Sequence, residues 1–277
     1  MDLIPALQQI WRSLGFEGPV TAYLAVFGLA MARLMTAVTL APFLGGKGVP
    51  SQVKTGVAGA LTVLLFPVLE PVTQQEMPIL LWVALLVKEV LIGALLGLLA
   101  QLVFIGIQMA GTIIDTQRGM NQFSFFAPQL EGNTSALGLL KFQAALVVFL
   151  ALDGHLIFIQ ALGDSFVSAP VAQFPALATN GSLLVDRLAR FSADTFLIAL
   201  KLSAPVLIAL FLIDACFGAL GKIAPQVPVH GEAHTLKGLA ALAIILLGLP
   251  LLIEQFGVSM IDMLAGVRDV IGLVGGA

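Results

Sequence analysis

Long runs of apolar residues, separated by shorter polar connections, dominate the hydrophobic pattern of this chain. The runs are too long for the strands of a membrane barrel, and they lack the alternation of apolar and polar positions that such strands need. The pattern therefore predicts an all-α protein with about six hydrophobic helical segments. The predicted segments cover residues 20–41, 57–72, 79–114, 136–162, 195–221 and 238–256.

These segments differ in length, and two of them contain residues that disturb a simple span. A lipid-crossing helix needs about 20 apolar residues. Segment 57–72 is shorter than that and contains Pro67, whereas segment 79–114 is longer and contains Lys88 and Glu89. Twenty-eight glycines and 14 prolines also favour kinks and close helix contacts. We therefore expect kinked or broken helices packed against protein.

Three longer connections link the predicted segments. They cover residues 42–55, 115–135 and 163–194. The last of them contains an amphipathic run, Ser182–Phe191, whose apolar residues recur at helical spacing. This run predicts either an interfacial or partner-docking helix or a short connector helix.

Composition places the chain among integral membrane proteins. Of its 277 residues, 59% are hydrophobic and 10% are charged, whereas soluble domains have about 45–50% and about 25%. A net charge of −3 offers no basic excess for nucleic acid, and the single cysteine, Cys216, excludes an internal disulfide framework. The first 19 residues lack the pattern of a cleavable signal peptide, so we expect the apolar segments themselves to insert into lipid.

Among the charged residues within or beside the apolar segments, six stand out, because a charge there is costly unless it has a partner or a function. They are Arg33, Lys88, Glu89, Asp194, Lys201 and Asp214. Asp194 and Lys201 are seven residues apart and share a helix face, from which Asp214 points away. The first three have no partner that local spacing identifies. Two interpretations stay open: an ion or proton pathway, or side chains that satisfy other helices of an assembly or extend to the membrane surface.

One face of segment 79–114 is small and polar. Gly93 and Gly97 form a pair of small residues one helical turn apart, and Gln101 and Gln108 continue the stripe. Close helix packing uses both glycines and amides, whereas lipid penalises the amides. We expect this face to be buried against protein.

The sequence contains no pattern typical of an enzyme or of a cofactor site. There is no phosphate-binding loop, no nucleotide fingerprint and no nucleophile elbow. His230 and His234 lie one helical turn apart, but no third ligand is evident and Gly231 weakens a helix there. We interpret this stretch as a connector and predict no metal site, no cofactor and no catalytic residue.

Connection 115–135 concentrates one methionine and three phenylalanines among amide side chains. Gly119 permits a tight bend, and Pro128 prevents a helix from continuing. Flexible Met and flat Phe side chains in a narrow passage could form a compliant apolar plug that excludes water. The alternative is a re-entrant loop with a purely structural role. The candidate plug consists of Arg118, Gly119, Met120, Asn121, Gln122, Phe123, Ser124, Phe125 and Phe126.

Several motifs in this order resemble the export-gate component of type III secretion systems, the SctT family of injectisomes and its flagellar relative FliR. The string Ile-Ile-Asp-Thr-Gln-Arg-Gly at 113–119, followed by Pro128, carries most of the resemblance and is closer to the injectisome branch, which we favour. Asp153-Gly154-His155 is closer to the flagellar branch. Further similar stretches are Pro42 to Pro50, Lys88-Glu89 with Ile92-Gly93, and Ala224-Pro225-Gln226.

The resemblance implies a single-copy pore subunit that passes unfolded secreted proteins across the bacterial inner membrane, within the basal body of the secretion system. It implies assembly with SctR/FliP-type and SctS/FliQ-type subunits, a SctU/FlhB-type switch protein at the entrance, and a SctV/FlhA-type subunit that couples export to the proton gradient. The helices would form bent hairpins in this assembly, in contact with membrane lipid. The stretch 118–126 would be the family's plug.

Two rivals remain on sequence grounds. A stand-alone secondary transporter of a small solute or ion commonly shows two related halves with matching broken helices, and no convincing internal repeat is evident. A membrane scaffold without any pore is the other rival. We expect a single domain over residues 1–277.

Overall fold

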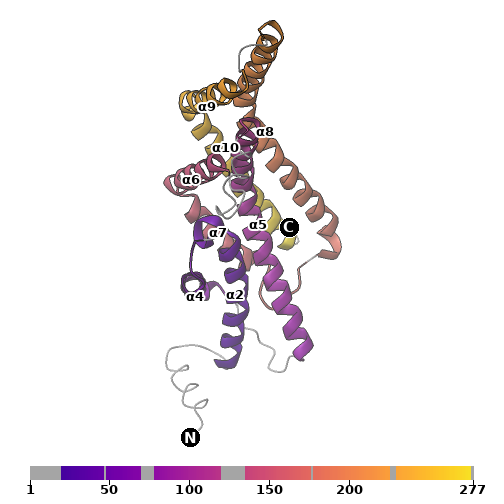
Figure 1. Ribbon diagram of the computed structural model, residues 1–277. Helices are drawn as coiled ribbons and strands as arrows, with labels where there is room; N and C mark the ends of the chain where they lie inside the picture. The colour runs from indigo at the N-terminus through magenta and orange to yellow at the C-terminus, as the bar shows by residue number, and fades with distance from the viewer. Residues whose placement is uncertain are drawn as a thin grey trace. The chain divides into compact units, whose positions relative to one another are not determined.

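The computed structural model describes residues 20–46, 48–69, 78–119, 135–175, 177–224 and 229–275. Every regular element within these ranges is a helix, which confirms the predicted all-α class (Figure 1). In chain order, the elements are α2 Val20–Leu40, α3 Pro42–Gly45, α4 Ser51–Leu65, the 3-10 turn η1 Phe66–Val68, α5 Ile79–Gln117, α6 Ala136–Ala151, α7 Gly154–Ser168, α8 Leu177–Ile223, α9 Val229–Leu247 and α10 Leu249–Gly275.

Four of the described helical segments are long and apolar enough to cross a bilayer, and this confirms an integral membrane protein. They are α2, α4 extended through η1, α5, and α8 from Gly181 onward. Helices α6 and α7 would add a fifth if they form one interrupted span. Two of the six predicted segments are divided: segment 136–162 between α6 and α7, and segment 238–256 between α9 and α10 at Gly248.

Helix α5 differs from its prediction because it is a single continuous helix of 39 residues. Of the kinked or broken helices expected, segment 79–114 is therefore not a broken one. At about 1.5 Å per residue, α5 is about 58 Å long, which exceeds the hydrocarbon thickness of about 30 Å. Its internal charges do not interrupt it because other parts of the chain satisfy them, as described below.

Helix α8 is also longer than predicted. It covers 47 residues, with Pro205 inside it. The amphipathic run Ser182–Phe191 is neither an isolated connector nor a separate interfacial helix, because it continues directly into segment 195–221. Likewise, α9 begins at Val229, so His230 and His234 lie on a helix rather than in a connector.

Segment 136–162 is interrupted at residues 152–153, between α6 and α7. Ser135 caps α6, since its Oγ atom accepts a hydrogen bond of 2.8 Å from the amide of Gly138. After α6 ends, Asp153 adopts a positive φ of 55°, which a helix does not allow. A side chain at Gly154 would overlap the ring of Phe149. This position therefore requires glycine and starts α7.

The chain forms two compact units, here called unit 1 and unit 2. Helices α5, α8 and α10 each contribute residues to both. Unit 1 contains the described residues of Met1–Gln101, His155–Arg187 and Leu264–Ala277, and unit 2 those of Leu102–Gly154 and Leu188–Met263. The single domain expected from the sequence stays a prediction.

Each unit has its own apolar core. In unit 1, Leu34 of α2, Leu96 of α5 and Leu162 of α7 are at most 1% exposed. In unit 2, the ring of Phe104 on α5 lies 5.5 Å from that of Phe149 on α6, in an edge-on arrangement. A second cluster in unit 2 consists of Ile114, Leu137, Val206, Leu210, Ala241 and Ile245.

Candidate functional site

The guanidinium of Arg33, near the middle of α2, is fully buried in unit 1. Its Nε and Nη2 atoms donate to the two carboxylate oxygens of Glu89 on α5, the latter at 2.9 Å. Nη1 donates to the Ser165 carbonyl at 2.7 Å and to the Ser165 hydroxyl at 3.1 Å, and Nη2 donates to the Ala169 carbonyl at 2.8 Å. The guanidinium carbon lies 4.2 Å from the centre of the Phe166 ring. All five N–H groups of Arg33 thus have acceptors.

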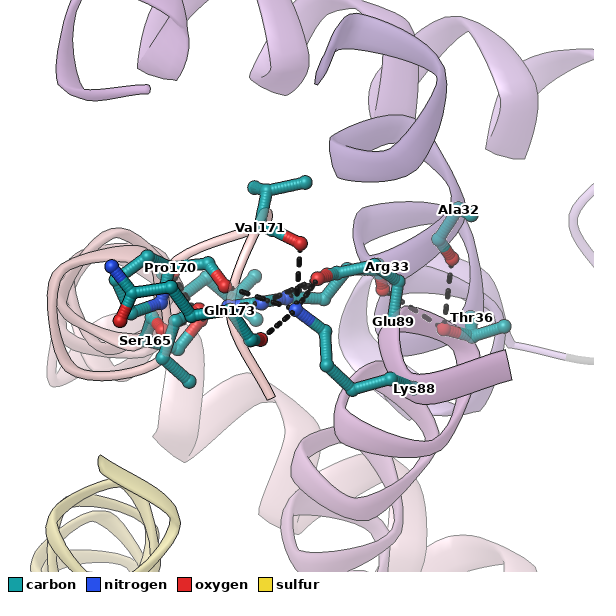
Figure 2. Close-up of polar contacts among 11 residues, drawn as sticks. Ala32, Arg33, Thr36, Lys88, Glu89, Ser165, Pro170, Val171 and Gln173 are labelled. Atoms are coloured by element: carbon teal, nitrogen blue, oxygen red, sulfur yellow. Dashed lines mark hydrogen bonds and ion pairs between the residues drawn. The ribbon is translucent and has the colours of Figure 1, made fainter. Parts of the chain in front are cut away.

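Lys88, the residue before Glu89, is held by the chain that follows α7. Its ammonium donates to the carbonyl oxygens of Pro170, Val171 and Gln173 at 2.8–2.9 Å. It also lies 2.6 Å from a carboxylate oxygen of Glu89. The three carbonyls converge on the ammonium from one side (Figure 2). Every N–H of Lys88 therefore has an acceptor.

Arg33, Lys88 and Glu89 are here called the charge cluster. Their side chains are 0%, 5% and 0% exposed. Burial of ions is costly, and it becomes tolerable only when geometry and hydrogen bonds compensate for lost water. Two cations share one carboxylate, and the remaining positive charge faces backbone carbonyls. The Ser165 carbonyl lies in the last turn of α7 and the Ala169 carbonyl directly follows it, where the helix dipole favours cations.

The charge cluster joins α2, α5 and the C-terminal end of α7 within the chain itself. The sequence left open either an ion pathway or charged side chains that bond to other helices. This geometry supports the second interpretation for Arg33, Lys88 and Glu89, and the bonding partners belong to the same chain. Local spacing missed the pairing because Arg33 and Glu89 are 56 residues apart.

The other three charged residues predicted inside the membrane lie in unit 2, on α8. Asp194 and Lys201 are exposed in the isolated chain. Asp214 forms an ion pair with Lys237 of α9 and accepts a hydrogen bond of 3.5 Å from Gln117 at the end of α5. Asp214 thus connects three helices, which the sequence did not indicate.

The small face of α5 lies against α2. A Cβ atom at Gly93 would overlap the carbonyl oxygen of Arg33 and the hydroxyl of Thr36. A Cβ atom at Gly97 would lie 2.8 Å from the Cβ atom of Leu40, closer than real side chains approach. The two helix backbones therefore touch here, as the spacing of small residues suggests.

The rest of this stripe is only half-buried at Gln101 and Gln108. A further close contact, which the sequence reading missed, joins Gly111 of α5 to Gly138 of α6. A Cβ atom at Gly111 would lie 2.7 Å from the carbonyl carbon of Leu137. Gly111 lies eighteen residues after Gly93, five full turns, so it occupies the same face of α5.

The last turn of α5 leads into the candidate plug. Arg118 and Gly119 are described, and Gly119 has a positive φ of 78°, which favours glycine and ends the helix. Asp115, 2% exposed, lies 3.2 Å from Arg118 and bonds to the start of α6. The remaining candidate plug residues lie outside the described ones: Met120, Asn121, Gln122, Phe123, Ser124, Phe125 and Phe126.

Sequence comparison assigns the class of this protein. The model of the bacterial export proteins, family 1, matches residues 24–263, and the chain belongs to this family. It is 30% identical over 248 residues to the flagellar biosynthetic protein FliR of Pectobacterium carotovorum. These aligned residues cover 88% of this chain and 93% of that protein. It is also 30% identical over 220 residues to the Yop proteins translocation protein T of Yersinia pestis, covering 79% and 83%.

A third relative is the secretion system apparatus protein SsaT of Salmonella typhimurium, 27% identical over 248 residues, covering 86% of this chain and 92% of that protein. The resemblance found in the motifs is thereby confirmed. The chain is an inner-membrane component of a bacterial type III export apparatus. Flagellar and injectisome relatives reach the same 30% identity, so the branch favoured from the motifs stays a prediction.

Proposed function

We propose that this chain is a pore subunit of the type III export gate, through which unfolded secreted proteins cross the inner membrane, and that stretch 118–126 is its plug. The observation that carries the proposal is the setting of that stretch. It leaves α5 at Gly119, where the helix ends on a positive φ, and the chain returns at Ser135, the cap of α6. Asp115 of α5 accepts hydrogen bonds from Ser135 and Leu137, where the chain enters α6.

The composition of this stretch supports a seal against water. Its Met and Phe side chains are apolar and are interspersed with the polar side chains of Asn121, Gln122 and Ser124. An apolar constriction of this kind blocks ions because dehydrating an ion in it is costly. It can widen because methionine and phenylalanine rotate without breaking hydrogen bonds. The chain would need no catalytic residue or cofactor for this role.

The exposed surface of the isolated chain supports assembly with further subunits and lipid. Phe196, Ile208 and Phe211 on α8 are 61–66% exposed. Such apolar side chains are stable only against lipid or protein. By resemblance to the family, the partners are SctR/FliP-type and SctS/FliQ-type subunits, with SctU/FlhB-type and SctV/FlhA-type proteins at the cytoplasmic side.

The plug is tested by conductance of the assembled export gate in planar bilayers. Replacing Phe123, Phe125 and Phe126 together by alanine removes the apolar seal, and we expect a steady leak of ions through the closed gate. The matched control is Ser124→Ala, in the same stretch, which leaves the rings in place and is expected to stay closed. A triple variant that assembles normally and conducts no more than the unsubstituted gate contradicts the plug.

The pore-subunit role is tested separately by native mass spectrometry of the gently extracted protein from its own host. One copy in a complex with several distinct small membrane proteins supports the role, and the identity of these partners gives the branch. A lone chain that transports a radiolabelled solute, with dependence on Lys201 or Asp214, would instead support a stand-alone transporter.

A further inference from the structure

Helices α5 and α6 touch backbone to backbone just before α5 ends. The contact is made by Gly111 and Gly138. A Cβ atom on the latter would lie 2.9 Å from the carbonyl oxygen of Gln108 and 3.0 Å from the hydroxyl of Thr112. This crossing places the next turn of α5, which carries Asp115, beside the first turn of α6.

Asp115 bonds to both sides of the connection between these helices. Its Oδ2 atom accepts hydrogen bonds from the hydroxyl of Ser135 at 2.6 Å and from the amide of Leu137 at 2.9 Å. Its Oδ1 atom lies 3.2 Å from the guanidinium of Arg118. Asp115, Arg118, Ser135 and Leu137 are here called the clasp, and all belong to unit 2.

The electrostatics of the clasp favour this one arrangement of the carboxylate. In the last turn of α5, Asp115 meets the negative end of the α5 dipole, which alone would be unfavourable. The first turn of α6 offers the opposite end of a dipole and an amide that lacks a helical partner. Ser135 caps the same turn through Gly138 and donates to Asp115, so one hydroxyl serves both elements. The carboxylate of Asp115 is therefore held in place mainly by hydrogen bonds from the start of α6.

We propose that Asp115 is a positioning residue of the export gate. It binds the last turn of α5 to the first turn of α6, so the chain leaves the one helix and enters the other at a fixed separation. This inference rests on the proposed function, because the stretch attached to the clasp is the proposed plug. The clasp itself consists only of described residues, and its existence can be tested without reference to conductance.

The test uses the complete export gate, with this chain carrying Asp115→Asn or Asp115→Ala. Hydrogen exchange of the peptide that contains Leu137 reports the clasp directly, since that amide donates to Asp115. We expect exchange about 10- to 100-fold faster than in the unsubstituted gate, with the larger effect for alanine. The matched control is Asp262→Asn on α10, which changes an exposed carboxylate of the same unit and leaves this exchange rate unchanged.

A second readout distinguishes positioning from simple stability. Asp115→Asn is expected to leave the yield of assembled gate unchanged and to raise the ion leak of the closed gate. If Asp115→Ala fails to assemble, Ser135→Ala removes the Ser135–Asp115 bond together with the cap at Gly138 and keeps the Leu137–Asp115 bond, and faster exchange is expected there as well.

Unchanged exchange at Leu137 in both Asp115 variants overturns the inference. Faster exchange with a higher leak supports both the clasp and the plug. Faster exchange with no leak supports the clasp as the joint between the helices and contradicts only the plug. A failure of the clasp and a failure of the plug therefore give different results.

Discussion

Arg33 of α2 and Glu89 of α5 form a bidentate ion pair that is closed to solvent, although 56 residues separate them in the chain. Lys88 shares the same carboxylate and is held by three carbonyls after α7. This pair therefore determines how three segments of unit 1 meet. Its consequences can be measured in the protein as extracted in detergent.

Glu89→Gln is expected to be strongly destabilising. The substitution leaves two cations buried beside each other with no counter-charge, and removing one partner of a buried pair costs about 3–5 kcal/mol. The free energy of unfolding in mixed micelles measures the loss. The control is Glu254→Gln on α10, an exposed carboxylate, which is expected to change stability by less than about 0.5 kcal/mol. Equal stability of the two variants would show that the pair is not formed.

Exchanging the two charges is expected to fail as a rescue. In the double variant Arg33→Glu with Glu89→Arg, the new carboxylate faces the carbonyl oxygens of Ser165 and Ala169, which accept hydrogen bonds and repel an anion. The new guanidinium would lie beside Lys88. We therefore expect the double variant to be no more stable than Glu89→Gln, and recovery of unsubstituted stability would disprove the carbonyl contacts.

Lys88→Met is expected to cost about 1–3 kcal/mol of unfolding free energy, less than Glu89→Gln. Three carbonyls lose a donor, but the excess positive charge of the cluster also disappears. Lys88→Arg is expected to be no better than methionine, because a planar guanidinium does not fit a cage made for a compact ammonium. Thermal unfolding of the two variants side by side gives the comparison. An arginine variant as stable as the parent would contradict the cage.

The contact between α5 and α2 predicts that Gly93→Ala lowers stability, although alanine favours a helix by about 0.5–1 kcal/mol relative to glycine. The added methyl group would overlap the Arg33 carbonyl and the Thr36 hydroxyl. The matched control is Gly59→Ala on α4, where nothing lies within 4 Å and the same change is expected to stabilise. Opposite signs for the two variants in one unfolding assay are the expected result.

The apolar runs were enough to predict an all-α membrane protein, and the spacing of Gly93 and Gly97 was enough to indicate a packing face. Periodicity could not give the ion pair of Arg33 with Glu89, because contacts between distant segments leave no local pattern. Residues 257–275 of α10 were missed for a different reason. They alternate a buried face, including Met263 and Val267, with exposed charges, so no long apolar run marks them.

The continuity of α5 and α8 shows where local signals were overridden. Lys88 and Glu89 read as interruptions of an apolar helix, yet their partners come from α2 and the end of α7. In α8, the Asn180-Gly181 pair is typical of a turn, but the helix continues through it. Tertiary contacts, rather than local propensity, decide the course of the chain at such places.

Asp194 and Lys201, which are exposed on one face of α8, predict a contact of that face with another subunit. A lysine facing the hydrocarbon centre costs about 2.5–3.5 kcal/mol, so this face of α8 is stable only against a partner that carries polar groups. Lys201→Leu is expected to leave the unfolding free energy of the isolated chain within about 0.5 kcal/mol of the parent. It is expected to lower the yield of the intact export complex, measured by native mass spectrometry. Ile208→Leu, on the same face, is the volume-conserving control. A full yield of complex from Lys201→Leu would place this face against lipid, with the lysine extended to the membrane surface.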